Sequence, residues 1–219
     1  MPWAALVDFE LTLSLPPRVT ADSGIDALSH AIEAYVSRRA TMFSDAQALA
    51  ALRAIGPNLR MAVHHGSDRK ARAAMMLGAT LAGMAFSNAS VALVHGMSRP
   101  IGAAFHIPHG MSNAMLLPAV TEFGLDAAAT RYADCARAMG VARGDDDDSA
   151  ASAALLVELR SINADLSMPT IVAYGVDEVA FRAAMPTMAR QALASGSPSN
   201  NPRVPDEAEV IEIYSRLLG

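Results

Sequence analysis

Apolar residues recur every three or four positions along most of this chain, which is the spacing of one face of an α-helix. The pattern is clearest over residues 20–36, where Ile25, Leu28, Ile32 and Val36 fall on a single face. A strand would instead alternate apolar and polar residues at every second position. The pattern therefore predicts a helix with one buried face over this segment.

The same spacing predicts helices along the rest of the chain. The expected helices cover residues 44–63, 68–94, 111–123, 126–139, 149–166, 176–193 and a final stretch that opens near residue 206. We expect a break or kink near Gly56-Pro57, and we expect Pro100 and Pro108 to interrupt the chain between residues 94 and 111. Asp206 and Glu209 form a capping-box-like pair for the final helix.

Polar residues mark the expected starts of two other helices. Thr20, Asp22 and Ser23 are available as caps for the first helix. The acidic run GDDDDS at residues 144–149 lacks the alternating ligands and central glycine of a calcium loop. It therefore predicts a solvated helix start, where carboxylates are favoured.

Residues 1–19 do not follow the helical pattern. Ala4 to Val7 reads as a short strand, and Pro16-Pro17 closes the segment. We therefore expect residues 1–19 to form a linker with a remnant strand, and residues 20–219 to form one all-helical domain.

The composition supports closely packed helices. Hydrophobic residues make up 52% of the chain, whereas aromatic residues make up only 5%, and 13 residues are methionines. A core of small and flexible side chains suits helices better than a sheet, which favours β-branched and aromatic residues. The predicted fold class is therefore all-α, a helical bundle.

The charge pattern argues against nucleic acid as a partner. The net charge is -5, and Lys and Arg are scattered rather than gathered in a basic stripe. The single cysteine, Cys135, allows no internal disulfide, which indicates a reducing compartment, most simply the cytoplasm. We expect Cys135 to be a buried core residue rather than a reactive thiol.

One stretch has the length of a membrane span. Residues 73–94 carry no charge, yet they consist mostly of Ala, Gly and Met and include polar Thr80, Asn88 and Ser90. We therefore expect a buried central helix and no membrane partner. The first residues also show no secretory signal.

Asp26 and His30 are the first candidates for chemistry. They lie four residues apart in the first expected helix, which places a carboxylate and an imidazole on one face, one turn apart. Two such side chains can share a metal ion, although polar residues on any exposed helix face have the same spacing. Glu33 continues the stripe and is expected to support the ligands.

His95 and His109 strengthen the metal hypothesis. His95 ends the uncharged stretch, where an imidazole is costly unless it is hydrogen-bonded or coordinated. Gly96 and Gly110 follow the two histidines and permit a close approach of backbone or ligand. Three imidazoles and one carboxylate suit Fe(II) or Zn(II), and do not suit calcium or magnesium.

Two long motifs in the sequence resemble those of the iron-containing (group III) alcohol dehydrogenase family. They are SGIDALSHAIEAY at residues 23–35 and AGMAFSNASVALVHGMSRPIGAAFHIPHGMSNAMLLP at residues 82–118. GSPSNNPRVP at residues 196–205 is similar to the closing segment of that family. The resemblance covers nearly the whole chain.

The resemblance implies a fold, a metal site and an activity. The fold is the C-terminal helical half of the dehydroquinate synthase-like, iron alcohol dehydrogenase fold. The implied ligands of Fe(II), or of Zn(II), are Asp26, His30, His95 and His109. The implied activity is oxidation of an alcohol, or reduction of the matching carbonyl compound, with NAD(P) in the complete enzyme.

Two positions near the motif histidines carry open alternatives. Arg99 stands where many family members have a further histidine near the nicotinamide. It either fixes an anionic group by charge-assisted bonds or supports the fold. His106 either relays a proton or has a structural role, and the pair His64-His65 is expected to be solvated in a turn.

Family members are roughly twice as long, and their first half is an α/β domain with a Gly-rich turn that binds NAD(P). No G-x-G-x-x-G or Gly-Gly-Gly-Ser run is present here. We therefore expect a chain that lacks the cofactor domain, binds metal and has little or no dehydrogenase activity alone. Self-association or a homo-oligomer is expected through the apolar face that the cofactor domain would cover.

Other functions remain as alternatives. A polyol dehydrogenase or synthase relative, with zinc held by one Asp and two His, is disfavoured by the fourth ligand. A helical metal-binding or assembly module without catalysis stays open, and a cofactor titration would distinguish it. A di-metal bundle on Asp26, His30 and Glu33 would need two Glu-x-x-His pairs, which the sequence lacks.

Overall fold

The computed structural model describes residues 3–218, and the regular secondary structure in this range is entirely helical. The α-helices are α1 (Pro17–Val36), α2 (Met42–Ile55), α3 (Leu59–His64), α4 (Arg69–Ala89), α5 (Leu93–Phe105), α6 (His109–Gly124), α7 (Ala129–Met139), α8 (Asp148–Asp165), α9 (Glu178–Ala194) and α10 (Glu207–Ser215). Short 3-10 turns are η1 (Phe9–Thr12), η2 (Leu125–Ala127), η3 (Ser197–Asn200) and η4 (Arg216–Leu218). The predicted all-α class is confirmed.

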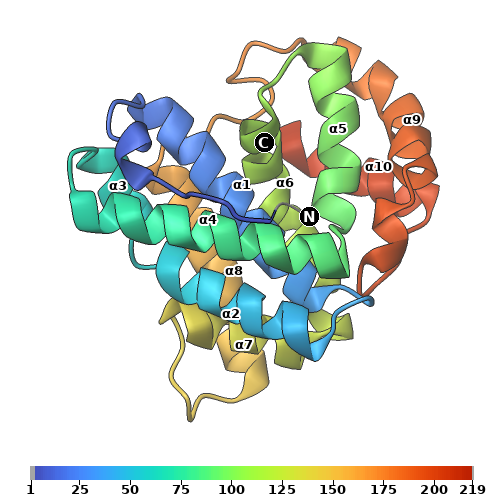
Figure 1. Ribbon diagram of the computed structural model, residues 1–219. Helices are drawn as coiled ribbons and strands as arrows, with labels where there is room; N and C mark the ends of the chain where they lie inside the picture. Colours follow the sequence, from blue (N-terminus) through green and yellow to red (C-terminus); the bar gives the residue numbers. More distant parts are fainter. Residues whose placement is uncertain (1–2, 219) are drawn as a thin grey trace.

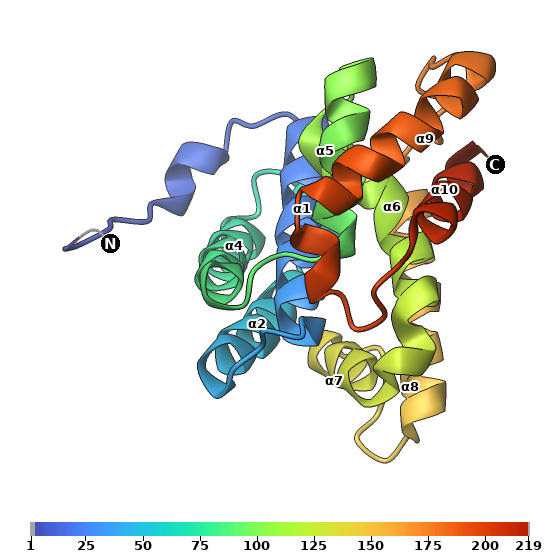
Figure 2. The ribbon, with the colours of Figure 1, turned by 90° about the vertical axis from the view of Figure 1, so that its right-hand side faces the viewer.

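Helix α1 lies at the centre of the bundle. It contacts α2, α3, α4, α5, α6 and α7. Figure 2 shows it between α2 and α4 on one side and α6 and α10 on the other, and in Figure 1 α5, α9 and α10 gather on the right. The predicted apolar face is buried, because Ile25, Leu28 and Ile32 are at most 1% exposed. This packing fixes α1 at the centre of the bundle and buries its Glu33, which is 2% exposed.

The helix starts agree in part with the predicted caps. Asp147, from the acidic run, caps α8 by accepting a hydrogen bond from the Ala150 amide at 2.7 Å. The capping box of Asp206 and Glu209 at the start of α10 is confirmed. The caps predicted for α1 are wrong, because that helix begins at Pro17. Proline is favoured in the first turn, where its missing N–H costs no helical hydrogen bond.

The long helix predicted over residues 68–94 is in fact two helices. Helix α4 ends at Ala89, α5 begins at Leu93, and the two are bent by 103° relative to each other. Ser90 connects them with a positive φ of 64°. His95 therefore lies in the first turn of α5 and does not end an uncharged helix.

Proline and glycine interrupt the chain at some of the predicted places. The break near Gly56-Pro57 is confirmed, since α2 ends at Ile55 and α3 starts at Leu59. Pro108 immediately precedes α6, as expected of an interrupting proline. Pro100 lies inside α5 instead.

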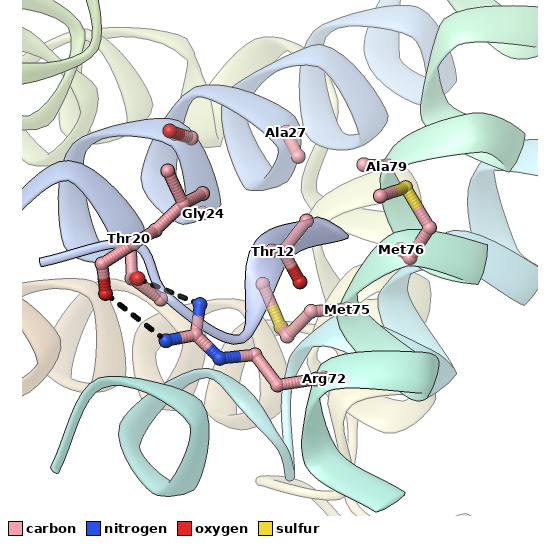
Figure 3. Close-up of a pocket in the computed structure, with 10 residues that line it drawn as sticks. Thr12, Thr20, Gly24, Ala27, Arg72, Met75, Met76 and Ala79 are labelled. Atoms are coloured by element: carbon pink, nitrogen blue, oxygen red, sulfur yellow. Dashed lines mark hydrogen bonds between the residues drawn. The ribbon is translucent and has the colours of Figure 1, made fainter. Parts of the chain in front are cut away.

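No strand is present at Ala4–Val7, and residues 4–8 have no regular structure. Within the described range no strand exists that this segment could pair with, and Leu6 is fully exposed. Figure 3 shows how the chain reaches α1: the buried Arg72 donates to the Thr20 hydroxyl at 2.7 Å and to the Leu15 carbonyl at 3.4 Å. This arginine lies beside a small cavity of about 150 Å³ between η1, α1 and α4.

Cys135 lies in the helical core. It is completely buried, and burial raises the pKa of its thiol, as expected of a core residue.

Among the described helices, none is by itself long and apolar enough to cross a bilayer, and only the sharply bent pair α4–α5 meets the length and composition criteria jointly.

Glycine permits two close contacts beside the motif histidines. A Cβ at Gly110 would overlap the backbone carbonyl of Asp22 on α1, and a Cβ at Gly96 would lie 2.8 Å from the ring of Pro198. The expected close approach of backbone is therefore present at Gly110, whereas the neighbour at Gly96 is a side chain. It allows α6 to pack directly on α1 and brings His109 towards Asp26.

We predict that Gly110→Ala lowers the free energy of unfolding by about 1–3 kcal/mol, the usual cost of overpacking. The added carbon meets backbone atoms of α1, which cannot turn aside as a side chain does. Gly83→Ala in α4 is the matched control, because its Cβ meets nothing within 4 Å. Urea or thermal unfolding measures the stability of both variants. An equal loss of stability in the two would show that the close contact with α1 is not the cause.

Candidate metal centre

Three polar residues on α1 point towards the start of α5. Asp26 and Glu33 both contact His95, and His30 stacks on the His95 ring with 4.4 Å between centroids. The stripe predicted from the spacing along α1 is therefore assembled in the structure. Its three side chains meet one histidine that is far away in the sequence.

The Glu33 carboxylate connects α1 to α5. Its Oε1 accepts hydrogen bonds from the amides of Val94 at 2.6 Å and His95 at 3.4 Å, and its Oε2 accepts a short hydrogen bond from His95 Nδ1. Glu33 is only 2% exposed. The carboxylate satisfies amides at the positive end of α5 and also fixes the orientation of the imidazole. Nε2 of His95 is left facing Asp26.

Asp26, His95 and His109 bring three ligand atoms together. Asp26 Oδ1 lies 3.3 Å from His95 Nε2 and 3.6 Å from His109 Nε2, and all three atoms lie within 4.8 Å of one another. Transition metals are bound by nitrogen and oxygen at about 2.0–2.2 Å, so ligands of one ion lie roughly 3–3.5 Å apart. The spacing of these atoms therefore suits a single divalent cation.

His30 lies beside this group without belonging to it. Its Nδ1 is 3.9 Å from Asp26 Oδ2, and its ring is stacked on Phe86 with 4.2 Å between centroids. Phe86 and His95 thus hold the two faces of the His30 ring. Its role as a fourth ligand stays a prediction.

The protonation states of Asp26, His30 and His109 favour the binding of a cation. Burial lowers the pKa of His30 to about 4, with a further contribution from the charge of His95. Burial and the same charge also hold the pKa of His109 below its ordinary value. Burial raises the pKa of Asp26, but the hydrogen bond from His95 and the imidazole charges outweigh it and leave this pKa lowered. At neutral pH the site therefore offers an ionised carboxylate and the free lone pairs of His30 and His109.

His95 behaves differently from the other two histidines. Burial lowers its pKa, but the charge of Glu33 and hydrogen bonds to Asp26 and Glu33 outweigh burial and raise the pKa to about 9. A metal ion needs the Nε2 lone pair that this proton occupies. Binding of a cation at His95 therefore involves release of a proton from its imidazole.

The sequence does not predict the role of Asn113. This residue of α6 is completely buried, and its Nδ2 donates to Asp26 Oδ1 at 2.6 Å. The same nitrogen lies 3.3 Å from His95 Nε2 and 3.2 Å from His109 Nε2. Its only signal in the sequence is its position four residues after His109, on the same helix face. Many polar residues share such a spacing.

The remaining candidates lie at the edge of the site or away from it. Arg99 is exposed and donates to the Ser197 hydroxyl at 3.3 Å, which is a supporting contact. His106 is exposed at the left-handed end of α5, with φ of 55°. The alternatives for these two residues stay predictions. His64 and His65 are exposed at the end of α3.

Comparison with known proteins identifies the family. The sequence profile described as "Fe-containing alcohol dehydrogenase family, C-terminal" matches residues 20–218. The chain belongs to the iron-containing alcohol dehydrogenase family. The family resemblance expected from the motifs is therefore confirmed.

Individual family members are similar in sequence and in structure. The chain is 48% identical over 177 residues to a long-chain-alcohol dehydrogenase of Geobacillus thermodenitrificans, covering 80% of this chain and 45% of that protein. It is 41% identical over 221 residues to a 1,3-propanediol dehydrogenase of Citrobacter freundii, covering 100% of this chain and 56% of that protein. A solved 1,3-propanediol oxidoreductase superposes with a TM-score of 0.91 at 36% identity, covering 96% of this chain and 54% of that one. The chain thus spans about half the length of these relatives.

We predict that Asn113→Leu lowers the affinity of the chain for Zn(II) by roughly 10–100-fold, the usual cost of removing a hydrogen bond that orients a metal ligand. The variant keeps a similar volume but removes the donor that holds Asp26. Asn163→Leu is the matched control. The Asn163 amide, on α8, donates to the carbonyl of Ala114 on α6 and contacts no ligand. Competition titration with a chelator measures both affinities. Similar losses of Zn(II) affinity in both variants would show that the substitutions act through a general change in folding.

Proposed function

We propose that Asp26, His95 and His109, joined by His30, hold a divalent iron or zinc ion in an NAD(P)-dependent alcohol dehydrogenase. The observation that carries this proposal is the convergence of three ligand atoms from α1, α5 and α6 within 4.8 Å of one another. Family membership supports it independently.

The residues present fit such an ion. One carboxylate and three imidazoles form a donor set of intermediate softness, which Fe(II) and Zn(II) accept. The lowered pKa of Asp26 keeps its negative charge available. When bound, the cation supplies Lewis-acid polarisation of the oxygen of an alcohol or carbonyl substrate.

The protein's own groups hold the ligands in place. Glu33 fixes the His95 ring through Nδ1, which directs Nε2 to the site. Asn113 restrains the Asp26 carboxylate, and Phe86 supports the His30 ring from one face. Groups of this kind reduce the reorganisation that a metal site needs when substrate binds.

We infer the reaction class from the names of the relatives. They are called long-chain-alcohol, 1,3-propanediol and 1-propanol dehydrogenases, so a primary alcohol and its aldehyde are the proposed substrate and product. A bound nicotinamide would supply the hydride chemistry, and the protein would supply orientation and electrostatics.

A second candidate is a helical metal-binding or assembly module without catalysis of its own. The observation that favours it is that the ligand cluster of Asp26, His95 and His109 is formed by helices of this domain alone. A titration with NAD or NADP separates the two functions, because only the dehydrogenase has a use for the nicotinamide cofactor.

We predict that the chain purified without oxygen binds one Fe(II) or Zn(II) ion and has little or no dehydrogenase activity alone. Asp26→Ala and His95→Ala should lose the metal, whereas the control His64→Ala, an exposed histidine, should keep it. Elemental analysis and calorimetric titration measure binding. Absence of metal from the unmodified chain would refute the site, and turnover of simple alcohols at about 1–1,000 s⁻¹ would refute the predicted inactivity.

We also predict that the chain self-associates through α2 and α4. Phe43, Leu77 and Met84 are between 43% and 55% exposed on these helices, and Phe43 and Met84 line one open groove. Leu77→Glu combined with Met84→Glu should reduce the mass measured by light scattering after size exclusion. Val157→Glu on α8 is the control for an added charge at an exposed apolar residue elsewhere on the surface. A monomeric unmodified chain would contradict the prediction.

A further inference from the structure

A second polar cavity lies beside the metal centre, between the end of α4 and the start of α5. Its volume is about 330 Å³, at the lower end of the range of sites for small molecules. The residues that line it are Arg39, Phe86, Ser87, Asn88, Ser90, Val91 and Arg99. All of them except Arg39 belong to the motif at residues 82–118, but the proposed metal site does not use this cavity.

The cavity is positively charged. Arg39 and Arg99 are its only charged residues, and no acidic residue lines it. Over residues 3–218, neither arginine has a carboxylate oxygen within 4.0 Å, whereas Arg131 pairs with Asp45 and Arg60 with Glu158. Arg99 gives one hydrogen bond to Ser197, which leaves most of its five N–H donors free.

The cavity adjoins the proposed metal ligands. Phe86 lines the cavity and also stacks on His30. Ser98, which precedes Arg99, has its hydroxyl 3.5 Å from His109 Nδ1. The cavity and the proposed metal ligands are therefore neighbours, which share Phe86 and the segment of Ser98 and Arg99.

The backbone at the cavity is in an unusual conformation. Ser90 has φ of 64° and ψ of 164°, a region that residues other than glycine rarely adopt. This residue makes the sharp change of direction between α4 and α5, and that change places the cavity next to the site. Strained residues of this kind are common at ligand sites.

We propose that this cavity binds the carboxylate of a substrate that carries an alcohol or aldehyde at its other end. Arg39 and Arg99 bind the oxyanion, and the reacting oxygen lies at Asp26, His95 and His109. The inference rests on the proposed function, because the second end of the substrate is placed by the metal site. Arginine binds planar oxyanions through paired hydrogen bonds, and a phosphate of the cofactor has the same oxyanion chemistry.

The test compares matched ligands on the zinc-loaded chain. 4-Hydroxybutyrate and 1,4-butanediol have the same carbon length and differ by one carboxylate, and pyrophosphate represents the cofactor. Calorimetry or chemical-shift titration gives each dissociation constant for the unmodified chain, Arg39→Gln, Arg99→Gln and Arg38→Gln. Arg38 is the matched control, because it donates to the Ser199 carbonyl and does not line the cavity.

We expect the unmodified chain to bind 4-hydroxybutyrate at least about tenfold more tightly than the diol, a factor that corresponds to about 1.4 kcal/mol. Arg39→Gln and Arg99→Gln should each remove most of this preference, and Arg38→Gln should keep it. Equal binding of acid and diol overturns the proposal. Binding of pyrophosphate alone, lost in the same two variants, also overturns it and assigns the cavity to the cofactor.

The two proposals fail in distinguishable ways. Zinc content is measured first, and a chain that does not hold zinc refutes the metal site. A chain that holds zinc but shows no preference for the carboxylate refutes only the anion cavity. Zinc content should be unchanged in Arg39→Gln and Arg99→Gln, which excludes a general loss of folding as the cause.

Discussion

The buried carboxylate of Glu33 is the interaction on which the proposed centre depends. A charge at this depth is costly unless every oxygen has a partner, and here two amides and one imidazole provide them. The same contacts satisfy the first amides of α5 and orient the His95 ring. Without Glu33, the first amides of α5 and the His95 imidazole would lose the acceptor that they share. The fold and the site therefore depend on the same carboxylate.

Close helix packing gives the remaining geometry. Gly110 allows α6 to touch the backbone of α1, and Asn113, one turn after His109, then reaches Asp26. The site is thus formed by α1, α5 and α6. The close separation of α1 and α6 depends on the absence of a side chain at Gly110. A metal site formed from rigid helices has little freedom, which agrees with the narrow range of distances among its ligand atoms.

The charges around the centre divide it into two parts. The ionised Asp26 and the neutral imidazoles of His30 and His109 favour a cation, whereas Arg39 and Arg99 make the adjoining cavity suitable for an anion. Phe86 lies between the two parts, in contact with His30 and with the cavity. A substrate with an alcohol at one end and a carboxylate at the other would use both, and a neutral alcohol would use only the first.

The sequence by itself determined the all-α class, most of the helices and the pair Asp26 and His30, because these depend on spacing within one helix. The apolar surroundings in the sequence and the adjacent glycines indicated His95 and His109, and the family motifs supported them as ligands. Tertiary structure decided the bend at Ser90, the absence of a strand at residues 4–7 and the position of Asn113. Each of these depends on contacts between residues far apart in the chain, such as Glu33 with Val94, or on a missing neighbour for a strand, which local periodicity does not record.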